Sequence, residues 1–147
     1  VMLKHEDWPG LEKISFLRQA QKDQDLREFP ILCGNGGVFL DLEIARGADG
    51  AMTGYAFPDM LVDLVKLRKS GDIESAHNLF DAHLPLMRYE QQPSIGLSVR
   101  KNVLMRRGVI THDVLRSPGG SLSKTALAEI EFLLKRVALH DPRAILD

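Results

Sequence analysis

Short apolar runs alternate with longer amphipathic segments over the first half of the chain. The runs near 1–4, 29–33 and 48–54 have the length and composition of strands, and the last is made mostly of small residues. After each run, apolar side chains recur every three or four positions, which predicts a helix. Strands and helices that alternate in units of roughly twenty to thirty residues predict parallel strands joined by crossover helices.

The second half of the chain has helical patterns and no further strand pattern. Aspartate and serine accept hydrogen bonds from the first turn of a helix and so indicate where helices begin. Three helices are predicted, with starts at Asp72, at Ser94, and at Ser121 or Ser123. A loop at 116–120 precedes the last of them. We therefore divide the chain into an α/β part at 1–71 and a helical domain at 72–147.

Three βα units do not complete a closed barrel. A (β/α)8 barrel needs about 250 residues, and three parallel strands alone leave both edges of the sheet bare. The α/β part is therefore either a small open sheet or the end of a barrel whose earlier units are missing. The chain also opens on Val1, inside an apolar segment and without an initiator methionine, so we expect the carboxyl-terminal part of a longer protein.

Composition and charge narrow the class of protein. The 147 residues are 44% hydrophobic with a formal net charge of -1, as in a globular chain with one core. The interspersed charges predict no nucleic-acid-binding face, and the apolar runs are too short for a membrane span. The single cysteine, Cys33, excludes an internal disulfide. We expect a buried, inert thiol and a cytoplasmic protein.

Lys4 is the first candidate for chemistry. It stands at the carboxyl end of the first predicted strand, the edge at which parallel sheets place their active sites. If the apolar residues before it bury the amine, the neutral form can attack a ketone and form an iminium. The turn Gly34–Gly37 and the small residues 51–54 share this edge and could admit an anion or a substrate. A solvated lysine and turns without a ligand are the alternative interpretation.

The other polar residues are weaker candidates for a functional site than Lys4. The five histidines have no metal-ligand spacing, so no metal and no cofactor are predicted. Side chains alternate along a strand, so His5 should point away from the face that carries Lys4. Four basic residues of one helix should form a solvated face or ion pairs across a subunit contact. They are Arg100, Lys101, Arg106 and Arg107.

Taken together, the three strand ends resemble the dihydrodipicolinate synthase/N-acetylneuraminate lyase family over essentially the whole chain. Met2–His5 is similar to the family's sixth strand, G-[IL]-K-[DE], but departs from it on both sides of the lysine. Cys33–Gly36 resembles the turn after the seventh strand, and Gly47–Gly54 resembles the eighth, G-[AG]-x-G-x-[IV]-[ST]. With Phe57–Asp59, the last segment is most similar to the branch that acts on 2-keto-3-deoxy sugar acids, such as 2-keto-3-deoxyarabonate dehydratase.

The resemblance implies the last three βα units of a (β/α)8 TIM barrel, followed by a carboxyl-terminal three-helix appendage. It implies a class I lyase, an aldolase or a dehydratase, in which Lys4 forms a Schiff base with a pyruvate-like or 2-keto-3-deoxy sugar acid. Gly34, Asn35, Met52 and Thr53 would line the substrate pocket. The expected partner is this small molecule, without nucleic acid or membrane, in a homo-oligomer.

The same resemblance indicates what this chain lacks. The family binds the substrate carboxylate with a threonine pair after strand two and relays protons through a tyrosine of strand five, and both would precede Val1. We therefore expect this chain alone to be inactive. The alternative is a non-catalytic binding or interaction module on a half-barrel scaffold, whose bare edges would pair with another chain. A phosphate-binding open sheet built on the Gly34 turn is a third possibility.

Overall fold

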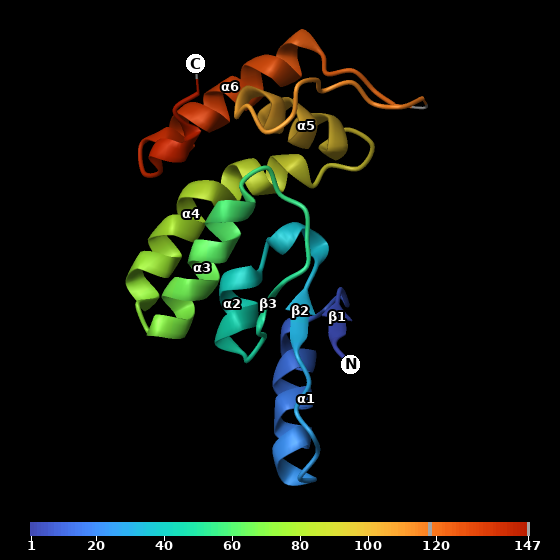
Figure 1. The fold of residues 1–147 in the computed structure, drawn as a ribbon, viewed down its shortest axis with the longest axis vertical. Helices are drawn as coiled ribbons and strands as arrows, with labels where there is room; N and C mark the ends of the chain where they lie inside the picture. The colour runs from blue at the N-terminus through green and yellow to red at the C-terminus, as the bar shows by residue number, and fades with distance from the viewer. Residues whose placement is uncertain (118, 147) are drawn as a thin grey trace. The chain divides into compact units, whose positions relative to one another are not determined.

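The computed structural model describes residues 1–117 and 119–146; Pro118, in the loop predicted at 116–120, and Asp147 lie outside the described residues. Strands and helices alternate first, and helices alone follow (Figure 1). The strands are β1 (Leu3–His5), β2 (Ile31–Cys33) and β3 (Gly50–Ala51). The helices are α1 (Leu11–Asp23), α2 (Leu40–Ala45), α3 (Pro58–Ser70), α4 (Ile73–Glu90), α5 (Gly96–Arg106) and α6 (Lys124–Ala138), with 3-10 turns η1 (Asn35–Gly37) and η2 (Pro142–Ala144).

The strands form one parallel sheet in the order β1-β2-β3, as the alternating pattern predicts. The register places Lys4 beside Leu32, and Leu32 beside Gly50. All three strands are shorter than the predicted apolar runs. In the second run, Pro30 has no N–H to donate to a neighbouring strand, so regular pairing begins at Ile31.

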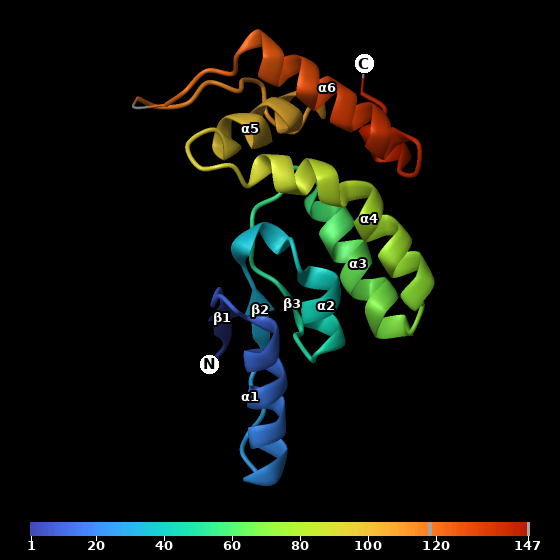
Figure 2. The ribbon, with the colours of Figure 1, turned by 180° about the vertical axis from the view of Figure 1, so that it is seen from behind.

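Helices cover one face of this sheet. The side chains of His5, Ile31 and Cys33 are buried on that face, whereas Lys4 is exposed and Leu32 is half-buried on the other. Figures 1 and 2 show α1 lying against the sheet from one side only. The predicted alternation of Lys4 and His5 is therefore confirmed. In a closed barrel, the face without helices is the interior.

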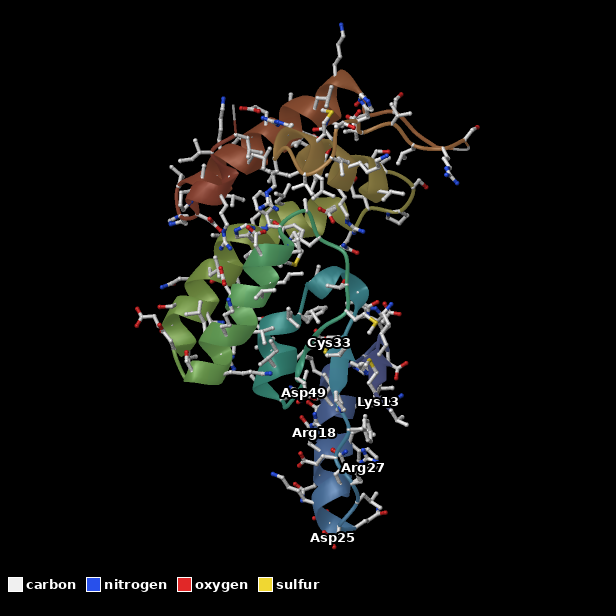
Figure 3. All side chains as sticks on the ribbon, viewed as in Figure 1. Lys13, Arg18, Asp25, Arg27, Cys33 and Asp49 are labelled. Atoms are coloured by element: carbon white, nitrogen blue, oxygen red, sulfur yellow. The ribbon has the colours of Figure 1, made fainter. Side chains whose placement is uncertain are left out.

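Arg18 of α1 ties the amino ends of the strands together. Its guanidinium donates to the carbonyl of Gly47 at 2.8 Å, to that of Phe29 at 3.1 Å and to Asp49 Oδ2 at 2.6 Å. The same Asp49 oxygen accepts a hydrogen bond of 2.7 Å from the backbone N–H of Ile31. Figure 3 shows Arg18 and Asp49 at this end of the sheet. The polar network fixes one edge of the sheet and leaves the carboxyl edge open for other contacts.

Two helix starts follow their predicted caps. The Asp72 carboxylate accepts from the N–H of Ser75 at 3.2 Å, and the Ser123 hydroxyl accepts from that of Ala126 at 3.1 Å. The helix α5 begins at Gly96, two residues after its predicted start at Ser94. None of the described helices has the length and apolar composition needed to cross a bilayer.

The described residues group into two compact units. The first contains Val1–Gly54 and Asp59–His77, and the second contains Tyr55–Pro58 and the residues from Asn78 onward. The segment Tyr55–Pro58 belongs to the second unit because its backbone and rings bond to helical residues there. The domain boundary expected after Gly71 stays a prediction.

Arg100 and Arg106 of α5, and Arg107 at its C-cap, bond within the second unit. The expected solvated face is therefore wrong for these arginines, and the subunit contact stays a prediction. Arg100 donates to the buried carboxylate of Glu90, and Arg106 pairs with a glutamate of α6. Arg107 donates to a backbone carbonyl, and its guanidinium lies 4.2 Å from the centroid of the Phe57 ring. A helical pattern shows that these arginines share an element, but not which acids face them.

A buried polar chain crosses the second unit. The Tyr55 hydroxyl lies 2.9 Å from Nδ1 of His83, and Nε2 of His83 lies 2.8 Å from Oδ2 of Asp141. Burial raises the pKa of Asp141, but hydrogen bonds from Arg143 and His83 outweigh it and hold that pKa at about 2. Asp141 is therefore an ionised acceptor, so Nε2 of His83 donates to it. In the neutral ring, Nδ1 accepts from the Tyr55 hydroxyl.

We expect Tyr55→Phe to destabilise the protein by about 1–3 kcal/mol, because it removes a hydrogen-bonding partner of a fully buried histidine. Urea denaturation followed by circular dichroism measures the change. The matched control is Tyr89→Phe, whose hydroxyl donates to Glu129 in a solvent-accessible bond. A loss no larger than that of the control would contradict a stabilising role for the buried chain.

Candidate active site

The carboxyl ends of the three strands meet at one edge of the sheet, as predicted. The N–H of Gly34 donates to the carbonyl of His5 at 2.9 Å, and the N–H of Met52 donates to that of Cys33 at 2.8 Å. These bonds extend the ladder past the strand ends and bring the three junctions side by side. All five predicted site residues lie at this edge within the first unit, namely Lys4 in β1, Gly34 and Asn35 after β2, and Met52 and Thr53 after β3.

Lys4 meets a carboxylate at this edge. Its Nζ lies 3.2 Å from Oε1 of Glu6, and the two side chains are 46% and 48% exposed. Val1 and Met2 are themselves exposed and do not bury the amine, so the expected apolar surroundings are absent from this part of the chain. Lys4 shares the open face with Leu32 and Gly50. In the part of the chain that the structure describes, the Lys4 amine therefore has the Glu6 carboxylate and the apolar strand β2 as its neighbours.

Glu6 is a candidate site residue that the sequence analysis did not single out. The available signal was its spacing, because residues two apart on a strand point to the same side. Glu6 also lies against Gly34, where an added Cβ would come within 2.2 Å of Oε1. The backbone φ of Gly34 is -104°, so glycine is needed there for space and not for a left-handed conformation. The glycine leaves room for the acid beside Lys4.

The turn after β2 uses positive φ angles at three successive residues. These are 50° at Asn35, 68° at Gly36 and 75° at Gly37, which explains why two glycines follow the asparagine. The Gly37 N–H donates to the Gly34 carbonyl at 2.9 Å, and an added Cβ at Gly37 would lie 3.4 Å from Thr53. The turn therefore satisfies part of its own backbone and packs against the β3 junction.

Two clusters of contacts lie at this edge. One contains Lys4, Glu6 and Gly34, and in the other the turn after β2 contacts Thr53. Met52 stands at the same edge and is 41% exposed. In the described part of the chain, the one charged group paired with Lys4 is Glu6. The shared edge supports a common site for all five predicted residues, while direct polar contact with the lysine is seen for Glu6.

Cys33 lies on the opposite, helix-covered face and is not a candidate nucleophile. Burial, followed by the neighbouring Glu43, raises the pKa of its thiol to about 12. The prediction of a buried thiol is confirmed, and its inertness stays a prediction that the raised pKa supports. Burial also raises the pKa of Glu43 to about 6, although a hydrogen bond from Cys33 acts in the opposite direction. The described residues contain no cluster of three or more histidine, cysteine or acidic side chains placed to hold a metal.

Glu43 should give the stability of the protein a distinctive pH dependence. Its carboxyl titrates near 4.5 when unfolded and near 6 when folded, so folding favours the protonated form. Wild type should therefore lose about 2 kcal/mol relative to Glu43→Gln as the pH rises from about 4.5 to 6. Urea denaturation across this range measures the difference.

The control for this measurement is Glu74→Gln, which changes an exposed glutamate of α4. Its stability should run parallel to that of wild type over the same pH range. If the stability of Glu43→Gln also runs parallel to wild type, the raised pKa of Glu43 is refuted.

Comparison with known proteins gives relatives for the whole described fold, although no family model matches the chain. The chain is 30% identical over 104 residues to L-2-keto-3-deoxyarabonate dehydratase of Azospirillum brasilense, a match that covers 71% of this chain and 33% of that enzyme. A crystal structure of dihydrodipicolinate synthase from Rhodopseudomonas palustris is 66% identical, with a TM-score of 0.89, over 92% of this chain and 45% of that one.

A more distant structure shows the same fold. The 4-hydroxy-tetrahydrodipicolinate synthase of Methylacidiphilum fumariolicum SolV is 24% identical, with a TM-score of 0.76, over 97% of this chain and 46% of that one. The chain thus spans between a third and a half of the length of these relatives. The (β/α)8 architecture expected from the sequence is confirmed for the part present. By sequence and fold, the chain belongs to the dihydrodipicolinate synthase family and matches the carboxyl-terminal half of its members.

Proposed function

We propose that this chain carries the Schiff-base-forming lysine of a class I lyase that acts on a pyruvate-like or 2-keto-3-deoxy acid. The observation that carries the proposal is the place of Lys4, on the open face at the carboxyl edge of the sheet, with the Glu6 carboxylate 3.2 Å from its Nζ. The names of two relatives, a 2-keto-3-deoxyarabonate dehydratase and a dihydrodipicolinate synthase, support the substrate class.

In the proposed first step, Glu6 accepts a proton from the Lys4 ammonium. The free amine then attacks the ketone carbon, a C–N bond forms, and the carbonyl oxygen becomes a hydroxyl by taking a proton from the nitrogen. Glu6 returns its proton to that hydroxyl, which leaves as water, and a protonated imine remains on Lys4. Protons and charge balance, and Glu6 ends as a carboxylate. The 3.2 Å separation lies within the reach needed for such a transfer.

The imine then acts as an electron sink for the adjacent carbon. Loss of a proton or cleavage of a C–C bond gives an enamine, from which a hydroxyl can leave, and hydrolysis frees Lys4. Dehydration and aldol chemistry share these steps. In the same proposal, Gly34, Asn35, Met52 and Thr53 form part of the pocket wall.

The chemistry is assigned to a completed barrel. In the described residues the edges of β1 and β3 have no further strand beside them, whereas closure requires eight strands. The remaining strands would enclose the open face, exclude water from Lys4 and supply further groups for binding the acid. A cytoplasmic homo-oligomer is part of the same proposal.

Borohydride trapping tests whether Lys4 forms the Schiff base. In a suitable chimera, this chain replaces the matching segment of the Rhodopseudomonas palustris dihydrodipicolinate synthase. Pyruvate plus borohydride should reduce the imine to a stable amine, and peptide mass spectrometry should locate the pyruvate carbons on Lys4. Lys4→Arg should abolish the adduct, while Lys66→Arg, on the exposed side of α3, should leave it intact. An adduct that persists in Lys4→Arg, or none in the parent chimera, would reject the proposal.

Two substitutions test the proposed proton transfer by Glu6. Glu6→Gln keeps the shape of the side chain but cannot take a proton, so trapping in the chimera should slow about 10²-fold. Gly34→Ala should also slow trapping, because its methyl group would occupy the space of the Glu6 carboxylate. The controls are Glu28→Gln and Gly120→Ala, since both sites are exposed and an added Cβ at Gly120 meets no atom within 4 Å. Unchanged trapping rates in both test variants would remove Glu6 from the mechanism.

A further inference from the structure

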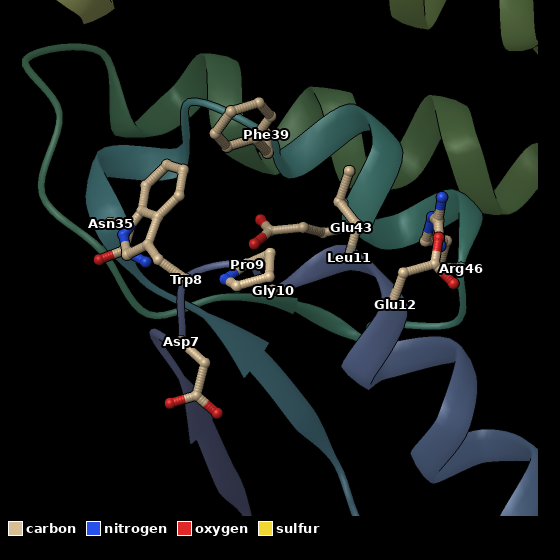
Figure 4. Close-up of a pocket in the computed structure, with 10 residues that line it drawn as sticks. All are labelled: Asp7, Trp8, Pro9, Gly10, Leu11, Glu12, Asn35, Phe39, Glu43 and Arg46. Carbon is tan, nitrogen blue, oxygen red and sulfur yellow. The ribbon is translucent and has the colours of Figure 1, made fainter.

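One pocket lies within the first unit, and Lys4 is not among the residues that line it. It has a volume of about 280 Å³ and is bounded by the turn after β1, the start of α1, η1 and α2 (Figure 4). Trp8, Pro9, Leu11 and Phe39 supply its apolar wall. The Trp8 and Phe39 rings meet edge to face, with centroids 5.1 Å apart. Of the five predicted site residues, Asn35 alone is shared with this pocket.

Most of the charges around the pocket are paired. Asp7 forms an ion pair with Lys13, and Glu12 lies 2.6 Å from the guanidinium of Arg46. Glu43 is different. Its residue is 6% exposed, and although Cys33 donates to this carboxylate, no described residue gives its Oε2 a hydrogen bond. Figure 4 shows this carboxylate directed into the space beside Trp8 and Pro9. The pocket therefore combines an aromatic wall with a buried acceptor.

We propose that this pocket binds a small primary ammonium ion with a ring-sized apolar body. The ammonium would donate to the Glu43 carboxylate, and the apolar body would lie against Trp8 and Phe39. The assignment is independent of the chemistry at Lys4.

Three properties favour a cation over other ligands. A buried carboxylate oxygen without a donor is costly to the protein, and a charge-assisted hydrogen bond would offset that cost. The indole of Trp8 offers the π face to which organic cations bind best. Three of the four ionisable lining residues are acids, namely Asp7, Glu12 and Glu43, so an anion such as a 2-oxo acid would be repelled. The volume is close to the lower range of small-molecule sites.

Trp8 makes the proposal directly measurable, because it is the sole tryptophan of the sequence and lines the pocket. Benzylamine is the probe and benzyl alcohol, which has a similar shape and no charge, is its control. At neutral pH, titration of the chain with benzylamine should change Trp8 fluorescence saturably. Benzyl alcohol should bind at least about tenfold more weakly, because it cannot form the charge-assisted bond.

Substitutions test whether Glu43 is the side chain that binds benzylamine. Glu43→Gln should weaken benzylamine binding at least about tenfold, whereas Glu74→Gln, at an exposed position of α4, should leave it unchanged. The comparison of amine and alcohol on the unaltered chain stands even if Glu43→Gln fails to fold. No saturable signal with benzylamine, equal affinity for the two probes, or equal affinity in a folded Glu43→Gln would overturn the proposal.

Discussion

The parallel register of three short strands is the constraint on which the candidate site depends. Because Lys4 pairs beside Leu32 and Leu32 beside Gly50, the lysine emerges on the face that α1 does not cover. A slip of one residue would exchange Lys4 with His5 and place the ammonium among buried apolar side chains. The backbone bonds that continue past the strand ends, from Gly34 to His5 and from Met52 to Cys33, then set the spacing of the edge.

The sheet separates two chemical environments. On its covered face, burial raises the pKa values of Cys33 and Glu43, which favours uncharged forms. On its open face, Lys4 and Glu6 are half-exposed and paired as opposite charges. For the strand residues, the parity of the position decides which environment the side chain meets, whereas Glu43 belongs to α2, which packs beside the sheet. The two proposed ligands, an anionic oxo acid and an organic cation, are both assigned to the first compact unit.

Local patterns were sufficient to predict the order of elements. The βα rhythm predicted the parallel sheet, the alternation of Lys4 and His5 followed from strand geometry, and Asp72 and Ser123 cap helices as their side chains suggest. The errors concern contacts between residues far apart in sequence. The partners of Arg100 and the cover expected over Lys4 depend on which elements meet, and no local pattern contains that information. Glu6 was missed because it lies against a glycine 28 positions later, which only the fold brings beside it.

Glu6 occupies the space that a side chain at position 34 would need. The residues at positions 6 and 34 therefore constrain each other although no bond joins them. As the Glu6 side chain is placed, it leaves no room for a Cβ at position 34, and a shorter residue at position 6 would remove that restriction. Substitution at these two sites should therefore be correlated during divergence. Among homologues, a glutamate two places after the lysine should occur together with glycine here, and bulkier residues should be found where the acid has been replaced.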